Sequence, residues 1–304
     1  MPPMVLEEIQ KLKYPRLTLE DCKVTDALLK QVSEISQLEA LGIQYTSETP
    51  ELVTKEGLNH LGKLTNLQQL MIKCEYDSSD ERIPFDRFPP ILGQLKKLEF
   101  LDLSGVELGE GELPALAELK HLRVLKLINS GATDKCLPSL ANFPGLRELY
   151  LAGTAVTSKG LAGIENCPEL MYVDLRETQI DDETIASLGK LPFLHLLNCS
   201  KTSIDGSGFK TWKTPQFLVA VGLNQTGITD ETMALMAKWP RLKDLHIRET
   251  NVTGEGLLKF SEGSDPIRIF CSKGQIDEEA GKQVMRKRVK ANVQMEYDLS
   301  LSTD

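Results

Sequence analysis

The strongest constraint on the fold of this chain is an internal repeat of 24 residues. Residues 146–156 read Leu-Arg-Glu-Leu-Tyr-Leu-Ala-Gly-Thr-Ala-Val, and residues 170–180 return to the pattern as Leu-Met-Tyr-Val-Asp-Leu-Arg-Glu-Thr-Gln-Ile. Ten full units cover residues 14–266, and they begin at Tyr14, Leu38, Leu67, Leu98, Leu122, Leu146, Leu170, Leu194, Leu218 and Leu242. A unit of this length cannot bury an apolar core alone and must stack on its copies. The repeat therefore predicts one solenoid domain over residues 1–304.

Each unit combines two periodicities. Leu101 and Leu103 alternate with Asp102, so the leucines point inward from a strand and the aspartate points outward. Residues 181–192 instead space their apolar side chains as one helical stripe, with acidic residues at the start and Pro192 at the end. The fold class is therefore α/β. Because helices are wider than strands, we expect a curved right-handed superhelix with a parallel sheet on its concave face and short helices on its convex face.

The ninth position of the unit carries small polar side chains. They are Cys22, Thr46, Ser130, Thr154, Thr178, Thr202, Thr226 and Thr250. We interpret them as a structural ladder whose side chains hydrogen-bond backbone groups of neighbouring turns that would otherwise be buried without a partner. A series of phosphorylation sites is the alternative interpretation.

The pattern LxxLxLxx(N/T/C)x(L/I) resembles the leucine-rich-repeat family over roughly residues 14–270. Within that family, the 24-residue unit ending in Thr-x-Ile-Thr-Asp looks like bacterial repeat proteins and the cysteine-containing class that is attached to F-boxes. The resemblance implies a binding scaffold, and its second branch implies a substrate-recognition subunit of a ubiquitin-ligase-like complex. The sequence shows no F-box-like helical segment.

The ends of the chain are expected to close the solenoid. Apolar residues at helical spacing in 1–13 predict an N-terminal cap, and residues 267–304 are expected to hold a degenerate repeat and a C-terminal cap. Within the latter, residues 277–291 predict an amphipathic closing helix. Its run of Lys and Arg is interpreted as a solvated face, with a localisation signal or an acidic partner as the alternative.

Two consecutive units are longer than the others. The unit from Leu38 has 29 residues and the unit from Leu67 has 31, so extra chain leaves the strands at about 46–55 and 75–90. Insertions of this kind collect on one rim of a solenoid, where they either contact a partner or are tolerated surface loops. The acidic residues of 75–90 also suggest calcium, but the glycine and the distal glutamate of an EF-hand are missing. We predict no metal site and no cofactor.

The net charge of −9 disfavours nucleic acid and anionic membranes as partners, because both are bound through clustered Lys and Arg. The N-terminus lacks the features of a signal peptide, and no stretch is long and apolar enough to span a bilayer. The six cysteines are Cys22, Cys74, Cys136, Cys167, Cys199 and Cys271; they form no CxxC pair, and most fall on small or apolar repeat positions. We therefore expect reduced thiols and a cytoplasmic monomer.

Few residues suggest catalysis. Of the four histidines, His60, His121 and His195 fall on surface positions of the repeat. His246 holds an outward fifth position, and Cys271 takes that position in the next, degenerate strand, so the two are expected to be neighbours that resemble a nucleophile and its base. No recognised catalytic motif accompanies them. The chain is therefore interpreted as a non-enzyme, with a Cys/His-dependent enzyme as the alternative.

The outward strand positions carry the main functional signal. They should be polar if they only met water, yet many are apolar or aromatic with charges around them. The residues predicted to bind a partner are Met71, Phe100, Asp102, Val124, Lys126, Ile128, Glu148, Tyr150, Tyr172, Asp174, Arg176 and Leu196. They predict a protein-protein interaction scaffold that binds a protein or peptide on its concave face, on the rim formed by 46–55 and 75–90, or on both. Simple cross-strand preference for β-branched and aromatic neighbours is the alternative. A carbohydrate-binding surface receptor is a further alternative, although the expected signal peptide and disulfide-closed caps are missing.

Overall fold

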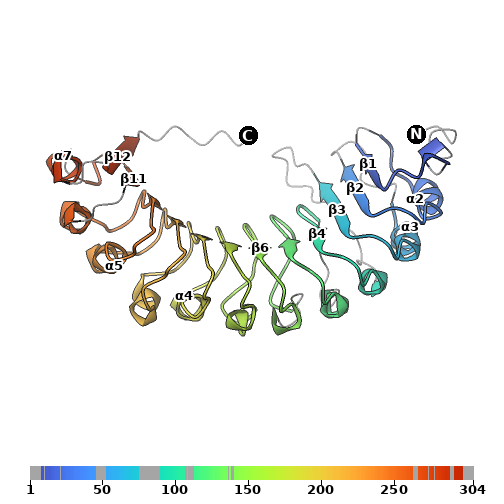
Figure 1. Cartoon of the computed structure of the whole chain (residues 1–304), viewed down its shortest axis with the longest axis horizontal. Helices are drawn as coiled ribbons and strands as arrows, with labels where there is room; N and C mark the ends of the chain where they lie inside the picture. The colour runs from blue at the N-terminus through green and yellow to red at the C-terminus, as the bar shows by residue number, and fades with distance from the viewer. Residues whose placement is uncertain are drawn as a thin grey trace. The chain divides into compact units, whose positions relative to one another are not determined.

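The computed structural model describes residues 8–9, 11–20, 22–45, 53–74, 90–106, 108, 113–135, 137, 140–262, 266–272, 274–276, 278–287 and 291–296. The chain forms two compact units, Met1–Cys167 and Pro168–Asp304. In both units, short helices cover one face of a parallel sheet and leave the other face uncovered (Figure 1). We call this uncovered side the open face.

The described part of the first unit holds six strands in chain order. They are β1 (Arg16–Leu19), β2 (Ala40–Tyr45), β3 (Gln69–Cys74), β4 (Phe100–Asp102), β5 (Val124–Lys126) and β6 (Glu148–Tyr150). The helices between them are α2 (Asp26–Val32), α3 (Lys55–Asn59), η1 (His60–Lys63), η2 (Pro90–Gln94), η3 (Leu113–Glu118) and η4 (Leu140–Asn142), and η5 (Ile164–Asn166) follows β6.

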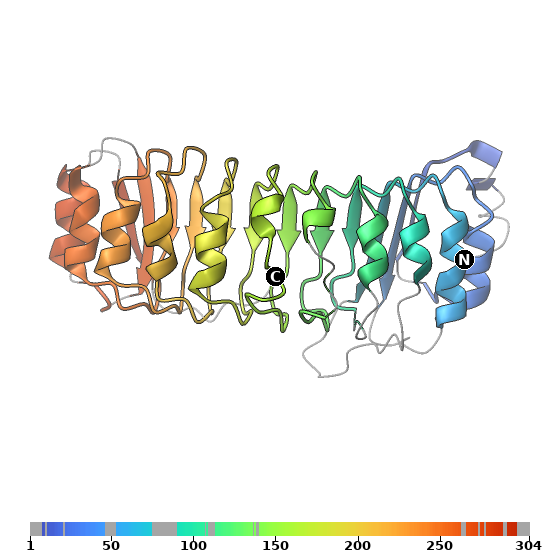
Figure 2. The same cartoon turned by 90° about the horizontal axis from the view of Figure 1, so that it is seen from below.

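The second unit repeats the arrangement. Its strands are β7 (Tyr172–Asp174), β8 (Leu196–Asn198), β9 (Ala220–Gly222), β10 (Asp244–His246), β11 (Ile267–Ser272) and β12 (Ala291–Glu296). Its helices are α4 (Asp182–Leu188), η6 (Ser207–Thr211), α5 (Asp230–Met236), α6 (Gly254–Leu258), η7 (Lys259–Glu262) and α7 (Glu278–Lys287). Viewed from the helical side, the helices lie side by side in front of the strands and run roughly parallel to them within each unit (Figure 2).

The predicted α/β leucine-rich-repeat solenoid is confirmed. Each of the ten predicted units supplies one parallel strand, and the inward positions form the core. Leu125 and Leu127 are completely buried, whereas Lys126 between them is half-buried on the open face. Burial of an aliphatic side chain of this size stabilises the folded state by about 1.5–3 kcal/mol.

The helical half of the unit varies more than the sequence suggests. The helices α4, α5 and α6 of the second unit follow a residue with extended backbone: Asp181 accepts a hydrogen bond from the N–H of Glu183 at the start of α4, as the acidic residues there predict, whereas Thr229 precedes α5 without a side-chain cap. Gly163 and Gly206, with φ of 86° and 91°, precede η5 and η6, which are short 3-10 helices. A left-handed residue at this point removes the extended N-cap conformation, so the α-helix does not start.

The polar ladder at the ninth position is structural, but its bonds differ from the prediction. Thr178 Oγ1 donates to the carbonyl of Leu175 at 2.6 Å, and Ser130, Thr154, Thr202, Thr226 and Thr250 do the same three residues back. The hydroxyl therefore closes the turn of its own unit instead of bonding a neighbouring turn. A three-residue reach within the turn is shorter than the distance to the next strand, so the local carbonyl is the acceptor.

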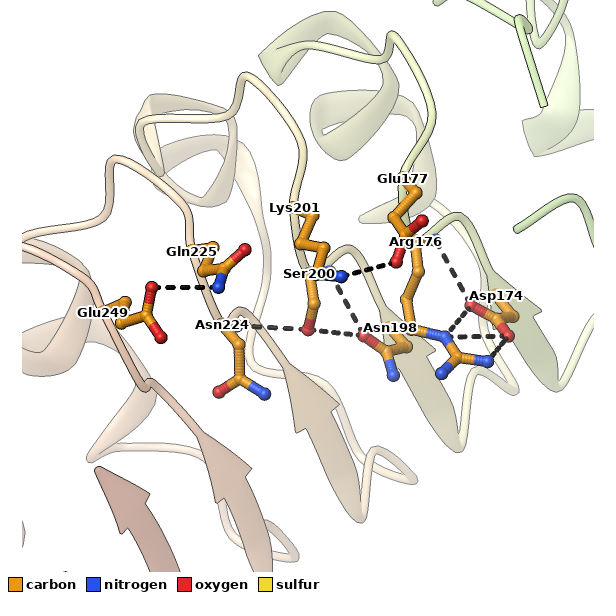
Figure 3. Close-up of polar contacts among 9 residues, drawn as sticks. All are labelled: Asp174, Arg176, Glu177, Asn198, Ser200, Lys201, Asn224, Gln225 and Glu249. Carbon is orange, nitrogen blue, oxygen red and sulfur yellow. Dashed lines mark hydrogen bonds and ion pairs between the residues drawn. The ribbon is translucent and has the colours of Figure 1, made fainter. Parts of the chain in front are cut away.

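The eighth position of each regular repeat adopts the left-handed backbone conformation. In the first unit this position is held by Gly105, Asn129 and Gly153. In the second unit it is held by Glu177, Lys201, Gln225 and Glu249, with φ between 53° and 58°. Left-handed backbone costs a non-glycine residue about 1–2 kcal/mol. The four polar side chains of the second unit line one edge of the sheet and interact in pairs. Lys201 forms an ion pair with Glu177 at 2.8 Å, and Gln225 donates to Glu249 at 2.9 Å (Figure 3).

The C-terminal part contains the predicted closing helix and an additional strand. Helix α7 lies inside the predicted range 277–291. Strand β12 then pairs with β11 in parallel along its full length, which the sequence analysis did not predict.

Of the N-terminal cap, residues 8–9 and 11–12 are helical. The insertions 46–55 and 75–90 lie outside the described residues except for 53–55 and Pro90.

The described cysteines have no disulfide partners. Cys22, Cys167, Cys199 and Cys271 are free thiols, and the last three are buried. Burial raises the pKa of the Cys167 thiol to about 11, with Glu165 adding to the rise. Side chains of Cys74 and Cys136 lie outside the described residues. Among the described helices, none is long and apolar enough to cross a membrane.

Candidate partner-binding surface

The open face of the first unit carries an assembled aromatic–lysine cluster. Parallel register places Asp102 of β4 beside Lys126 of β5, and Lys126 beside Tyr150 of β6. The Lys126 ammonium lies 5.6 Å from the Phe100 ring centroid and 4.7 Å from that of Tyr150. The Tyr150 hydroxyl donates to Glu148 Oε2 at 2.9 Å. Cation–π contacts at such sites are worth about 0.5–1 kcal/mol each, so the four side chains hold one another in place before any partner binds.

The apolar members of the predicted site also reach the open face of the first unit. Met71, Val124 and Ile128 are half-buried. The terminal methyl of Met71 lies over Gly42, where a Cβ would approach it to 3.1 Å. These side chains therefore add partly exposed apolar surface around the aromatic–lysine cluster.

The two predicted aspartates have a different environment from the rest. Asp102 and Asp174 are only 1% and 6% exposed. Asp102 Oδ1 accepts the N–H of Ser104 at 3.0 Å and its hydroxyl at 2.6 Å, which turns the backbone at the strand end. Asp174 makes the same turn with the N–H of Arg176 at 3.2 Å. Most of their hydrogen-bonding capacity is used inside the protein, which leaves little for a partner.

In the second unit, Arg176 forms an ion pair with Asp174. Its guanidinium donates two bonds to the carboxylate, Nε to Oδ1 at 2.9 Å and Nη2 to Oδ2 at 2.8 Å (Figure 3). The hydrogen bond to Asp174 is the main reason that the pKa of Arg176 is raised. The Arg176 side chain is still 47% exposed, so part of it remains accessible to a partner.

The other two predicted residues of the second unit lie near an aromatic row at the opposite edge of the strands. Tyr172 and Leu196 are half-buried neighbours in register. Tyr172 stacks on His195 with ring centroids 6.3 Å apart, and His195 stacks on Phe217 at 5.6 Å. Phe193, 47% exposed, lies 5.7 Å from Phe217. The sequence analysis missed this row, although aromatic residues at the position before the first repeat leucine are its signal.

A second feature that the sequence analysis missed is a polar chain at the ends of β8 and β9. Asn198 Oδ1 accepts the N–H and the hydroxyl of Ser200 at 3.1 and 2.8 Å, and Ser200 Oγ accepts the N–H of Asn224 at 3.1 Å. Asn224 Oδ1 in turn accepts the N–H of Arg248 at 2.8 Å. The bonds run from one 24-residue repeat to the next within the second unit (Figure 3). Polar residues at the seventh position, two beyond each strand, are the sequence signal for it.

The predicted neighbours His246 and Cys271 do not form a catalytic pair. The register places Phe270 beside His246, with the two rings stacked 4.3 Å apart. Cys271 is the next residue, so it points to the opposite face of the sheet and is completely buried. Burial raises the pKa of its thiol to about 11. The prediction was wrong by one residue of register, which in a strand exchanges the two faces.

The described residues contain no group of three His, Cys, Asp or Glu side chains that could hold a metal ion. A depression of about 560 Å³ lies where β8 and β9 lead into their turns. Its lining is mainly polar, and four of the eight lining residues are exposed: Thr202, Ser203, Ile204, Asp205, Gln225, Thr226, Gly227 and Glu249. It lacks the apolar walls of a small-molecule pocket.

Neither protein-family models nor curated proteins match the chain. Similar solved structures include the Leptospira interrogans LRR protein LIC12759, with TM-score 0.53, 16% identity, and coverage of 95% of this chain and 86% of that one. The plant peptide hormone receptor RGFR1, solved in complex with RGF2, has TM-score 0.56 and 15% identity, over 98% of this chain and 53% of its own. The LRR ectodomain of the Arabidopsis thaliana receptor kinase GASSHO1/SCHENGEN3, in complex with CASPARIAN STRIP INTEGRITY FACTOR 2, has TM-score 0.55 and 16% identity, over 97% and 36%.

The chain thus spans about half and about a third of the two receptor chains. At these identities the likeness concerns the fold, and the fold is that of the leucine-rich-repeat proteins. The narrower resemblance to the cysteine-containing, F-box-associated class stays a prediction.

Proposed function

We propose that the protein is a non-enzymatic scaffold that binds a protein or peptide on the open face of its sheet. The observation that carries the proposal is the aromatic–lysine cluster of Phe100, Lys126, Glu148 and Tyr150, which is assembled by contacts within the first unit. Tyrosine is among the residues that contribute most at protein interfaces. Because the cluster is already ordered, binding costs little side-chain entropy.

The structural neighbours support the class of partner. Two of the similar structures are plant receptors solved with RGF2 and CASPARIAN STRIP INTEGRITY FACTOR 2. Free, buried thiols at Cys167, Cys199 and Cys271 are consistent with the proposed cytoplasmic location.

The test is affinity capture with the full chain from its native host, followed by binding measurements with the purified partner. Tyr150→Ala should weaken binding at least tenfold, because an aromatic anchor in an interface contributes about 2 kcal/mol or more. Tyr150→Phe keeps the ring under Lys126 and should lose less. Tyr14→Ala is the matched control and should bind like the wild type. It removes a 54% exposed tyrosine that lies two residues before β1.

Thermal unfolding of each variant separates binding from stability. Tyr150 is on the open face and not in the core, so its replacement should leave the melting temperature nearly unchanged. Normal binding by Tyr150→Ala, together with loss of binding when residues 75–90 are deleted, would contradict the proposal and favour the insertion as the contact.

A further inference from the structure

The edge at which the strands of the second unit begin carries exposed aromatic rings beside exposed cations. Two positions of the repeat form this edge, the residue before the first repeat leucine and the residue after it. In three consecutive repeats these positions are held by Phe193, His195, Phe217, Val219, Arg241 and Lys243. We call these six residues the edge patch. Backbone hydrogen bonds of 2.8 Å hold the repeats side by side here, from Val219 to His195 and from Lys243 to Val219.

The aromatic half of the edge patch is ordered by contacts between its own rings. Phe193 lies 5.7 Å from Phe217, and its side chain is 47% exposed. His195 stacks on Phe217 with ring centroids 5.6 Å apart. The rings therefore form one partly exposed apolar surface that needs no rearrangement before it makes contact with another molecule.

The cationic half has no carboxylate partner. Arg241 Cζ lies over the Phe217 ring, 5.6 Å from its centroid, and both Arg241 and Lys243 are exposed. The carboxylate next to them in the chain, Asp244, instead pairs with Arg268 at 2.5 Å. Within the part of the chain that the structure describes, neither cation of the edge patch forms an ion pair.

The first unit shows what the same two positions do when they only support the fold. Lys97 and Arg123 hold them there, and each has a polar partner one repeat earlier. Lys97 Nζ donates to Asn66 Oδ1 at 2.7 Å, and Arg123 Nε pairs with Glu99 at 3.2 Å. In the edge patch, two apolar residues of the preceding repeat stand where these partners would be. The two cations are therefore available to an acidic group from outside.

We propose that the edge patch docks an acidic segment of a partner protein. An apolar side chain of this segment packs on Phe193 and Phe217, and a carboxylate pairs with Arg241 and Lys243. Neighbouring strands are about 4.8 Å apart, so the patch extends about 10 Å from Phe193 to Arg241, which an extended peptide covers in about three residues. This surface is separate from the aromatic–lysine cluster of the first unit, and the proposal does not depend on that site.

The charge along the edge also gives the segment a direction. Glu169 holds the position of Phe193 one repeat earlier, three strands away from Arg241. This separation is about 14 Å, which exceeds the screening length of about 8 Å at physiological salt. Glu169 therefore does not repel a carboxylate at Arg241, and the acidic end of the segment should lie at the β10 end of the patch.

The ring contacts favour a protein segment over a nucleic acid. A single-stranded nucleic acid stacks its bases on open ring faces. His195 already has a ring on each side, Tyr172 from the preceding repeat and Phe217 from the next. Phe217 has His195 on one side and the Arg241 guanidinium on the other. The ring edges are left, and apolar side chains can pack against them.

The test uses the full chain and a phage library of random dodecapeptides as the probe. Enriched peptides are synthesised with blocked ends and a neutral fluorophore, and their affinity is measured by fluorescence anisotropy at several salt concentrations. Arg241→Gln with Lys243→Gln should weaken binding of the enriched acidic peptides at least about tenfold and make the affinity less dependent on salt. Phe193→Ala should weaken binding at least about fivefold and leave the salt dependence unchanged, because it removes contact area and no charge.

The matched control is Lys97→Gln with Arg123→Gln. It makes the same charge change at the same repeat positions of the first unit and should bind the peptides like the wild type. Tyr150→Ala should also bind them normally, because its site is a different one. All the edge residues that are replaced are exposed, so the melting temperatures should stay nearly unchanged.

Three results would overturn the proposal. The selection could yield no acidic peptides, or the acidic peptides could bind the cation variant or the Phe193→Ala variant as tightly as the wild type. The third result is that a labelled oligothymidine binds the wild type and is lost from the same variants, which would assign the edge patch to nucleic acid.

Discussion

One junction between repeats departs from the others and predicts a pH-dependent stability. At three junctions an aspartate accepts two hydrogen bonds from a threonine of the next repeat, one from its backbone N–H and one from its hydroxyl. The pairs are Asp26 with Thr54, Asp134 with Thr157 and Asp230 with Thr253, at 2.6–2.8 Å. At the fourth, Asp182 accepts the N–H groups of Asp205 and Gly208 at 2.8 and 2.7 Å, and Asp205 stands where the threonine would be. A carboxylate thus faces a carboxylate where the other junctions have a hydroxyl donor.

The two pKa values move in opposite directions. The pKa of Asp182 is raised, first by burial and then by Asp205, although backbone hydrogen bonds oppose the rise. The pKa of Asp205 is lowered, mainly by hydrogen bonds from Ser207. The charges around the pair are those of Asp181 and Glu183, which flank Asp182 on α4, and the Lys210–Glu231 ion pair from η6 and α5.

The sign of the pH dependence follows from these shifts. A carboxyl with a raised folded pKa destabilises the fold above that pKa, and the penalty fades as the pH falls toward the unfolded value of about 4. The lowered pKa of Asp205 contributes stability above about pH 4 that is lost as the pH falls through its folded pKa. The penalty at Asp182 is therefore largest near pH 7 and small at pH 4.

Asp205→Thr should remove the part of this penalty that comes from Asp205 and leave the part that comes from the burial of Asp182. Like charges about 4 Å apart repel by about 1 kcal/mol in water and about 4 kcal/mol near a protein surface, and the exposure of Asp205 places the value toward the lower limit. We expect the variant to be about 1–2 kcal/mol more stable at pH 7, and the gain to shrink to less than about half by pH 4. Threonine can also replace Asp205 as the acceptor for Ser207, as Thr253 accepts the N–H of Glu255.

The assay is urea unfolding at pH 7, 5 and 4, followed by tryptophan fluorescence. Trp212 is a local reporter, because its Nε1 donates to the carbonyl of Ile185 on α4. Thr253→Asp creates the same carboxylate pair at a regular junction and should destabilise by a similar amount at pH 7. A change below about 0.3 kcal/mol in Asp205→Thr, or a gain that is equal at all three pH values, would refute the reasoning.

Three further predictions concern the core, the turns and the thiols. Leu125→Ala should lower the free energy of unfolding by about 2–5 kcal/mol in urea titrations, and a loss below about 0.5 kcal/mol would place this residue outside the core. Gln225→Val should cost about 1–2 kcal/mol because a β-branched residue resists the left-handed backbone, whereas Gln225→Gly should stay within about 1 kcal/mol of the wild type. Titration with a thiol reagent should count six thiols after unfolding without reductant, and two or fewer would contradict the reduced state. In the folded chain Cys199 should not react at pH 8, since burial raises its pKa.

The fold was largely predictable because stacked repeats use the same positions for the same task. The burial of Leu125 follows directly from the leucine pattern, and so does the outward placement of Lys126 and Tyr150. Where the repeat degenerates, the same logic failed. At β11 the register was assigned one residue off, which placed Cys271 on the open face when it is completely buried.

The sequence by itself determined the parallel strands, the buried leucines, the threonine positions and the residue types on the open face, because each depends on local periodicity. Only the tertiary structure decided what neighbouring units do together. Lys126 lies between two rings, Asn198 leans over Gly222, and Asp182 meets a carboxylate because residues about 24 positions apart are brought into register by the sheet. Such contacts depend on side-chain rotamers and hydrogen-bond choices between strands, and a repeat pattern specifies the positions without specifying the pairs.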